Sequence, residues 1–437
     1  MDVVQVIAAG PPVETDEALL ERFQRGAFTY FVQTFNPANG LTPDTTRPDS
    51  PSSIAVVGFA LSAYPVGVER GWMSRTDAAA RALTTLRFFW NAPQNEGPEA
   101  TGYKGFFHHF LDMRTGARVW RCELSPIDTT LLLAGMLTAA AYFSEDSAVE
   151  REIRALADAI YRRVDWSWAQ AGGATVRQGW KPGSGFLHYG WEGYSEAILL
   201  YALGLASPTH PLSDASYEAW TATYQWETIY HRDVLYAGPL FIHLFSHAWI
   251  DLAGLRDRFM REKRSDYFEN SRRAVEIQRE YARRDPRGFL GYDQDSWGLS
   301  ASDGPSRGRV RCDGRERRFF GYAARGAPYG PDDGTLAPWA PLAALPFAPD
   351  LAMAALRRLC ERHPRMTETS MLPSGYNPTL AEAGPEGWVS EGYFGLDQGI
   401  VVLMIENHRS GLIWRLMRSC PYLGQGLRRA GFRGGWL

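Results

Sequence analysis

Two glutamates stand where an aromatic loop meets an apolar segment, in the stretch WEGYSEAILLYALGLA (residues 191–206). Glu192 lies within the loop, and Glu196 directly precedes seven apolar residues, 197–203. A carboxyl group beside aromatic and apolar side chains is poorly solvated, which raises its pKa and lets it donate a proton near neutral pH. Glu196 is therefore predicted to act as a general acid.

Further carboxylates precede other apolar segments. Asp397 lies in FGLDQG, where small polar neighbours are expected to keep it ionised as a base, and Glu123 and Asp128 lie in RCELSPIDTT. Two carboxyl groups that flank a glycosidic bond can cleave it: one protonates the leaving oxygen, and the other activates water or attacks directly. These residues thus predict glycosidic bond cleavage.

The elements that must position these carboxylates are two alternating kinds of helix. One kind is apolar nearly all round, which requires burial on all sides, and is expected at residues 52–63, 128–143, 196–206, 238–250, 333–345 and 397–407. The other kind is amphipathic and is expected at residues 16–34, 75–91, 147–166, 214–224, 265–283 and 349–362. The alternation predicts an all-α fold, an (α/α)6 barrel of six inner and six outer helices with long rim loops.

In such a barrel the inner helices run parallel, so their N-termini meet at one rim. Asp128, Glu196 and Asp397 mark three of these starts, and Asp332 and Asp333 precede a fourth. Helix capping is the alternative explanation, although Glu is a poor N-cap. Long loops rich in Gly, Pro and aromatic residues are expected to form the walls of a cleft; they span residues 91–127, 165–195, 284–333 and 364–396.

Composition excludes several classes of function. A net charge of −3 does not favour nucleic acid or an acidic membrane as partner, and no uncharged apolar run reaches the roughly 18 residues of a membrane span. Phosphate-binding and dinucleotide-binding motifs are missing, so no cofactor is predicted. The 15 Trp residues suit either a sugar-binding pocket or a large aromatic core. The chain as given reads as cytoplasmic, or as periplasmic or secreted if a leader was removed.

One alternative site is a metal centre on the spacing of His243, His247 and Asp251. The more common role for such a stripe inside a barrel is a hydrogen-bonded wall, and the four cysteines show no zinc-ligand spacing. No metal is therefore predicted.

Many motifs, in order, resemble the glycoamylase-like family, whose members include endo-β-1,2-glucanases and the transglycosylase domain of cyclic β-1,2-glucan synthases. They include GFFHHFLD, ELSPIDTTLLLAG, WEGYSEA, AGPLFIHLFSHAWID, WGLSASDGP, YAARGAPYGPDDGT, GLDQG and MIENHRSGLIW. The resemblance covers residues 16–437, so the expected organisation is an extension at 1–15 followed by a single barrel domain at 16–437.

The resemblance implies roles for individual residues. Glu196 matches the general acid, and Asp397 matches a base that works through a substrate hydroxyl and water. Glu123 aligns with a nucleophile of the cyclising relatives, and Asp128 is expected to position the sugar or tune the pair. Substrate contacts are expected from Trp191, Glu192, Tyr194, Trp297, Asp303, Arg325 and Asp333. Glu192 departs from the aspartate expected at this position and is predicted to alter the neighbouring subsite.

Three functions follow in order of preference. The first is inverting hydrolysis inside a β-1,2-glucan, with Glu196 as acid and Asp397 as base. The second is a retaining transglycosylase, with Glu123 as nucleophile and Glu196 as acid/base. The third is a non-catalytic glucan-binding protein, which a missing rim carboxylate would have favoured. The expected partner is a β-glucan oligo- or polysaccharide, bound by a monomer or weak homo-oligomer.

Overall fold

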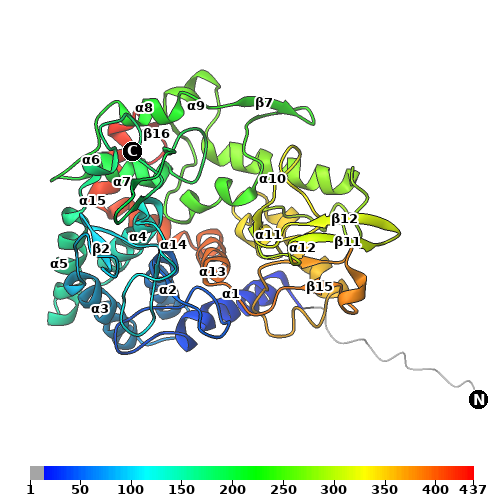
Figure 1. Ribbon diagram of the computed structural model, residues 1–437, viewed down its shortest axis with the longest axis horizontal. Helices are drawn as coiled ribbons and strands as arrows, with labels where there is room; N and C mark the ends of the chain where they lie inside the picture. The colour runs from blue at the N-terminus through cyan, green and yellow to red at the C-terminus, as the bar shows by residue number, and fades with distance from the viewer. Residues whose placement is uncertain (1–13) are drawn as a thin grey trace, which may run out of the picture.

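The computed structural model describes residues 14–437. The chain is mainly helical, and helix α13 (Gly395–Arg409) lies near the middle of the molecule in the view of Figure 1. Most of the predicted N-terminal extension, residues 1–13, lies outside the described residues. One continuous apolar core runs from Leu19 to Phe432. Within residues 14–437, every helix is too short or too polar to cross a membrane.

The inner elements form a closed ring. They are α2 (Ile54–Glu69), α4 (Pro126–Tyr142), α7 (Ile198–Ala206), two 3-10 turns, η1 (Leu240–His243) and η2 (Phe245–Ala248), α11 (Trp339–Ala343) and α13 (Gly395–Arg409). Helix α4 packs against α2 and α7, and α13 packs against α2 and α11. The η2 turn closes the remaining gap: its Ser246 hydroxyl donates to the Glu196 carbonyl at 2.6 Å, and Phe245 contacts Trp339 of α11.

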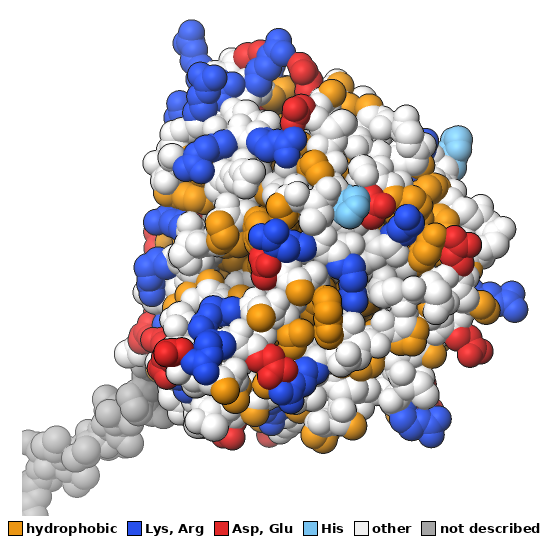
Figure 2. Space-filling view, turned by 90° about the vertical axis from the view of Figure 1, so that its left-hand side faces the viewer, with side chains coloured by type: hydrophobic (Ala, Val, Ile, Leu, Met, Phe, Trp, Pro, Cys, Tyr) orange, Lys and Arg blue, Asp and Glu red, His pale blue; other side chains and the backbone are white. Residues whose placement is uncertain are grey.

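Amphipathic helices surround this ring. They are α1 (Asp16–Gln33), α3 (Arg75–Asn91), α5 (Ala148–Arg163), α8 (Ser216–Thr221), α10 (Tyr267–Arg284) and α12 (Pro349–Arg362). On the side of the molecule seen in Figure 2, charges of both signs are spread between small groups of apolar side chains. An outer helix needs one apolar face for the ring and one polar face for water. The all-α (α/α)6 prediction is confirmed.

The remaining helices and the strands belong to the loops and the C-terminal segment. The helices are α6 (Trp166–Ala169), α9 (Arg258–Glu262), the 3-10 turn η3 (Ala381–Ala383), α14 (Leu412–Ser419) and α15 (Pro421–Arg429). The strands are β1 (Ser52–Ser53), β2 (Gly102–Tyr103), β3 (Phe106–Phe107), β4 (Phe110–Leu111), β5 (Trp180–Lys181), β6 (Gly185–Phe186), β7 (Trp226–Ile229), β8 (Arg232–Leu235), β9 (Leu255–Arg256), β10 (Ala301–Ser302), β11 (Gly308–Cys312), β12 (Arg315–Phe319), β13 (Ala323–Ala324), β14 (Tyr376–Asn377), β15 (Trp388–Val389) and β16 (Arg433–Gly434). They form two-stranded antiparallel sheets.

Two predicted inner helices are less regular than expected. Residues 238–250 form the η1 and η2 turns instead of one α-helix. The predicted helix at 333–345 is α-helical only over Trp339–Ala343, because Pro338 and Pro341 lack the N–H that a longer helix needs. Helix α7 begins at Ile198, so Glu196 stands just before the helix. Helices α14 and α15, which pack on α4 and α7, were not predicted.

Helices α2 and α4 approach each other closely through a pair of glycines. A Cβ atom built on Gly135 would lie 2.1 Å from the Gly58 carbonyl oxygen, and one built on Gly58 would lie 2.2 Å from the Leu131 carbonyl oxygen. Since both obstacles are backbone atoms, neither can move without shifting a helix. This contact sets the spacing of α2 and α4, and α4 in turn carries Asp128.

Gly135→Ala is expected to lower the free energy of unfolding. Alanine favours a helix over glycine by about 1 kcal/mol, but forcing the two helices apart costs about 1–3 kcal/mol or more, so the clash wins. Chemical denaturation measures the difference. Gly308→Ala is the control because the nearest atom to its added Cβ lies at 4.0 Å; equal stability of both variants would contradict the close-packing explanation.

Candidate active site

A cavity of about 750 Å³ opens at the N-terminal ends of the inner helices. Its walls include all four predicted catalytic residues: Glu123, Asp128, Glu196 and Asp397. Two predicted substrate contacts, Trp191 and Asp303, also line it. The expectation that inner helix starts meet at one rim is therefore met for α4, α7 and α13.

Glu196 is placed by the residues around α7. Its carbonyl accepts the Ser246 hydroxyl at 2.6 Å, which anchors the chain just before the helix. Residues 198–206 of that helix are all buried, and Glu196 itself lines the cavity. Burial raises the pKa of Glu196 to about 7, because removal from water disfavours the charged form. The carboxyl is thus partly protonated at neutral pH, as proton donation requires.

Asp397 lies in the first turn of α13 and is only 5% exposed. Burial raises its pKa well above the usual range; the negative charges of Asp44 and Asp303 add to this effect, while Ser374 opposes it. Its Oδ2 atom has no hydrogen-bond partner among residues 14–437. This environment differs from the expectation that small polar neighbours keep Asp397 ionised, because tertiary packing buries the residue. To act as a base Asp397 must first lose its proton, and in that ionised form a carboxylate of raised pKa is the stronger base.

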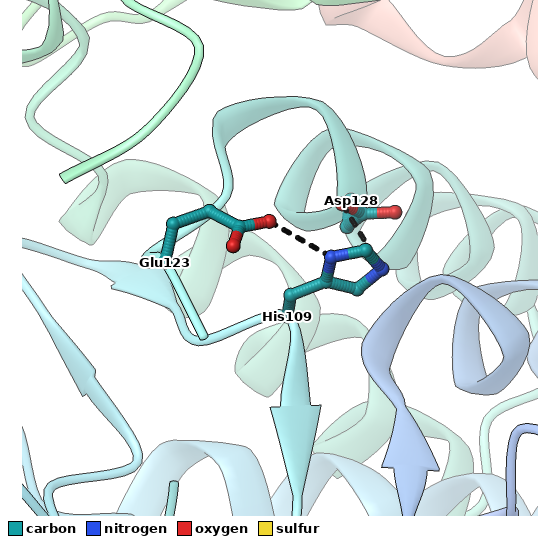
Figure 3. A group of neighbouring side chains, drawn as sticks. All are labelled: His109, Glu123 and Asp128. Carbon is teal, nitrogen blue, oxygen red and sulfur yellow. Dashed lines mark hydrogen bonds and ion pairs between the residues drawn. The ribbon is translucent and has the colours of Figure 1, made fainter. Parts of the chain in front are cut away.

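Glu123 and Asp128 flank a histidine that the sequence did not single out (Figure 3). His109 Nδ1 lies 2.9 Å from Glu123 Oε1, and its Nε2 lies 3.6 Å from Asp128 Oδ2. Burial alone would lower the pKa of His109, but Asp128 and Glu123, with a smaller contribution from the charge of Asp44, outweigh it and raise the pKa to about 9. The same hydrogen bond lowers the pKa of Glu123 to about 2. The group is therefore a protonated imidazole held between two carboxylates.

Asp128 also has a helix-capping role. Ser125 is the N-cap of α4, and its hydroxyl accepts the Asp128 N–H at 3.2 Å and donates to the Asp128 carboxylate. The potential ligand atoms of His109, Glu123 and Asp128 lie within 4.8 Å of one another, a spacing that could suit a metal. A metal ion would have to displace the proton of His109, and the protonated imidazole already supplies positive charge to these carboxylates.

Five predicted substrate contacts do not line the cavity. Arg325 and Asp333 form a fully buried ion pair at 2.6 Å, so they hold the 303–333 loop together instead of facing a ligand. Trp297 is buried at 2% exposure beneath α11 and α12. Tyr194 packs against Tyr267 and His243. Glu192 points outward, where its carboxylate accepts a hydrogen bond from the Thr175 hydroxyl at 3.1 Å. These contacts keep Tyr194 and Glu192 away from the cavity.

The alternative metal stripe is part of the barrel wall. His243 Nε2 lies 3.0 Å from the Ala237 carbonyl oxygen, and His247 Nε2 lies 3.1 Å from the Ser271 hydroxyl. Burial lowers the pKa of His243 to about 4 and that of His247 to about 3. Asp251 is paired with Arg418. These hydrogen bonds and this ion pair match the wall interpretation.

The structure adds cavity residues that sequence reasoning missed. They are Asp44, Arg47, His109, Phe110, Trp120, Tyr322 and Phe394. Phe110 stacks on His109 with ring centroids 3.9 Å apart and contacts the exposed Trp120. Tyr322 stacks with Phe394 with ring centroids 6.2 Å apart, and Arg47 lies over Phe394 and pairs with Asp303. The motif GFFHHFLD contains His109 and Phe110 and could have pointed to them. Residues 34–53, which supply Asp44 and Arg47, contain no motif that would have singled those residues out.

Glu123→Gln is expected to lower the pKa of His109 from about 9, because the variant loses one of the two charges that hold the proton. NMR titration of the imidazole measures this shift. His243 provides the internal control, since burial keeps it neutral. Because the pKa of His109 is raised on folding, its stabilisation is complete below its unfolded value near 6.5 and is lost as pH rises through about 9. An unchanged His109 pKa in Glu123→Gln would contradict the ion-pair assignment.

Comparison with known proteins places this site in a family. Residues 188–421 match the family model "Glycoamylase: Putative glucoamylase". The chain is 28% identical to the "Exo beta-1,2-glucooligosaccharide sophorohydrolase (non-reducing end)" of Parabacteroides distasonis, over 97% of this chain and 59% of that protein. It therefore spans about three fifths of the length of this relative.

Solved structures of β-1,2-glucanases are also similar to this chain over nearly its whole length. The endo-beta-1,2-glucanase of Chitinophaga pinensis, in complex with sophorotriose and glucose, superposes with a TM-score of 0.83 at 26% identity, over 97% of this chain and 100% of that one. The beta-1,2-glucanase of Parabacteroides distasonis superposes with a TM-score of 0.84 at 26% identity, over 97% of this chain and 61% of that one. Because the family model covers more than half of the chain, the protein belongs to the glycoamylase family.

Proposed function

We propose that the protein is a glycoside hydrolase that cleaves β-1,2-linked glucan within the chain, by general acid/base catalysis with inversion. The observation that carries this proposal is that two carboxyl groups of raised pKa, Glu196 and Asp397, face one cavity from the starts of two inner helices. Neither forms an ion pair with another residue of the described chain. Both carboxyl groups are therefore available to a ligand.

The two groups divide the chemistry. Glu196 donates its proton to the glycosidic oxygen as the bond breaks, and Asp397 takes up a proton from the attacking water, directly or through a substrate hydroxyl. Three other carboxylates of the cavity are engaged: Glu123 and Asp128 with His109, and Asp303 with Arg47. They fix the walls and the charge of the cavity.

The aromatic side chains support a sugar polymer as substrate. Two aromatic pairs line the cavity, Phe110 with Trp120 and Tyr322 with Phe394, and aromatic faces are the usual contact surfaces for sugar rings. The names of the relatives support the β-1,2 linkage. Cleavage within the chain is supported by the alignment with the whole of the endo-acting Chitinophaga pinensis enzyme, whereas the exo-acting relative is a longer protein.

The retaining mechanism has less support. A nucleophilic Glu123 would have to leave the hydrogen bond with His109 at 2.9 Å. The lowering of its pKa to about 2 by that bond also makes it a weak nucleophile. A purely binding function is disfavoured because every carboxylate that the chemistry needs is present.

Glu196→Gln and Asp397→Asn are each expected to reduce kcat on β-1,2-glucan by about 10²–10⁴-fold, the typical contribution of a general acid or base. A reducing-sugar assay on soluble β-1,2-, β-1,3-, β-1,4- and α-1,4-glucans measures both rate and linkage preference. The control is Glu192→Gln, because Glu192 belongs to the same loop but points away from the cavity.

Three outcomes of this assay are informative. Absence of product from every linkage would rule out the hydrolase. Preference for another linkage would rule out the proposed substrate. Full activity of Glu196→Gln would remove Glu196 from the acid role, even if Asp397→Asn were inactive.

A further inference from the structure

The carboxylates of the cavity divide into those with partners and those without. Six that are buried or partly buried line it: Asp44, Glu123, Asp128, Glu196, Asp303 and Asp397. Three of these are held by neighbouring cations or hydroxyl groups: Glu123 by His109, Asp128 by Ser125 and His109, and Asp303 by Arg47 and Ser390. Of the other three, Glu196 and Asp397 have proposed roles, and Asp44 has none.

Within residues 14–437, no side chain or backbone N–H donates a hydrogen bond to the Asp44 carboxyl, and no cation pairs with it. Burial raises its pKa to about 6; the charge of His109 opposes this, that of Asp128 adds to it, and that of Arg47 opposes it. Asp44 is only partly buried, and it lines the cavity, so its carboxyl oxygens are open to the space that a ligand would fill. Partial removal from water without a hydrogen-bond partner disfavours the charged form, and hydrogen bonds donated by a ligand would offset that cost.

The backbone holds Asp44 firmly in this position. Its N–H donates to the Pro51 carbonyl at 2.7 Å, and its carbonyl accepts the Gly395 N–H at 2.8 Å. Gly395 is the first residue of α13, so Asp44 is attached to the helix turn that carries Asp397. On the other side β1 pairs with β4, and the Ile54 N–H donates to the His109 carbonyl at 3.2 Å. The loop is thus tied to the elements that bear Asp397 and His109.

A fixed carboxyl with free acceptor atoms, facing a cavity, is suited to a ligand that presents hydroxyl groups. Sugars do this, because neighbouring ring hydroxyls can donate to both oxygens of one carboxylate. We propose that Asp44 is a further substrate-contacting residue, which accepts hydrogen bonds from free hydroxyls of the glucosyl unit held between Glu196 and Asp397. This inference rests on the proposed function. In this role Asp44 orients the ring and exchanges no proton with it.

The test is a binding measurement in a background that does not turn over. Calorimetric titration of Glu196→Gln with a linear β-1,2-linked glucopentaose gives the reference affinity. Adding Asp44→Asn is expected to weaken binding by about 10- to 100-fold, the range for a lost hydrogen bond to a charged group. Adding Asp49→Asn instead is the matched control, because Asp49 lies in the same loop and lines the cavity but is exposed.

A thermal unfolding measurement separates substrate contact from a structural role. Since the Asp44 carboxyl has no partner among residues 14–437, Asp44→Asn is expected to keep or raise the unfolding temperature while binding weakens. A lowered unfolding temperature together with weaker binding would assign the residue to the fold and overturn the proposal.

The remaining outcomes are equally distinct. Affinity within about twofold of the reference in Asp44→Asn would overturn the inference and leave the proposed hydrolase intact. If Asp44→Asn and Asp49→Asn weakened pentaose binding equally, the effect would come from the loss of any negative charge in the cavity. That result would also overturn the inference about Asp44. A Glu196→Gln background that does not bind the pentaose would overturn the proposed function, and the role of Asp44 with it.

Discussion

The burial of the inner helices on all sides is the constraint on which the site depends. Helices α2, α4 and α13 are packed between an outer layer and one another, with α2 and α4 in contact through Gly58 and Gly135. Along their lengths a charge needs a partner, as buried Glu406 of α13 has in Arg70, whereas Asp128, Glu196 and Asp397 lie at or just before helix starts that face the cavity. A carboxyl group at such a start is partly removed from water, which raises the pKa of Glu196 and of Asp397. The packing that stabilises the barrel therefore also prepares its acid and base.

The cavity holds several carboxylates together by pairing some of them. The imidazolium of His109 lies between Glu123 and Asp128, and Arg47 pairs with Asp303. These contacts supply positive charge near the walls, and in the part of the chain that the structure describes they leave Glu196, Asp397 and Asp44 without an ionic partner. Paired carboxylates stabilise the site, whereas an unpaired one costs stability and is retained where a ligand completes its hydrogen bonds. The presence or absence of an ionic partner therefore separates the structural carboxylates from the proposed catalytic and substrate-binding ones. All of them line the same cavity, so distance from the cavity does not separate them.

Much of the fold followed from local pattern, because periodicity is a local property. Segments that are apolar all round predicted α2, α4, α7 and α13, and the parallel arrangement of inner helices predicted that Asp128, Glu196 and Asp397 would meet. The η1 and η2 turns were not predicted, since their hydrogen bonds join Ser246 and His243 to residues of other segments and to a neighbouring loop.

The loops limited what could be predicted about the site. Arg325 and Asp333 were expected to contact substrate, but a loop rich in Gly and Pro does not show whether its charges face each other or a ligand; in the structure they face each other. Asp44 was missed because its position depends on a backbone hydrogen bond to Gly395, which lies at the other end of the chain.

The anomeric form of the first product tests the central claim most directly. If Glu196 is the acid and Asp397 the base, water attacks from the face opposite the leaving group and the configuration inverts. Proton NMR during the first minutes of β-1,2-glucan hydrolysis is expected to show the α-anomer at the new reducing end before mutarotation sets in. Initial release of the β-anomer would contradict this assignment and would point to a covalent intermediate on a carboxylate such as Glu123.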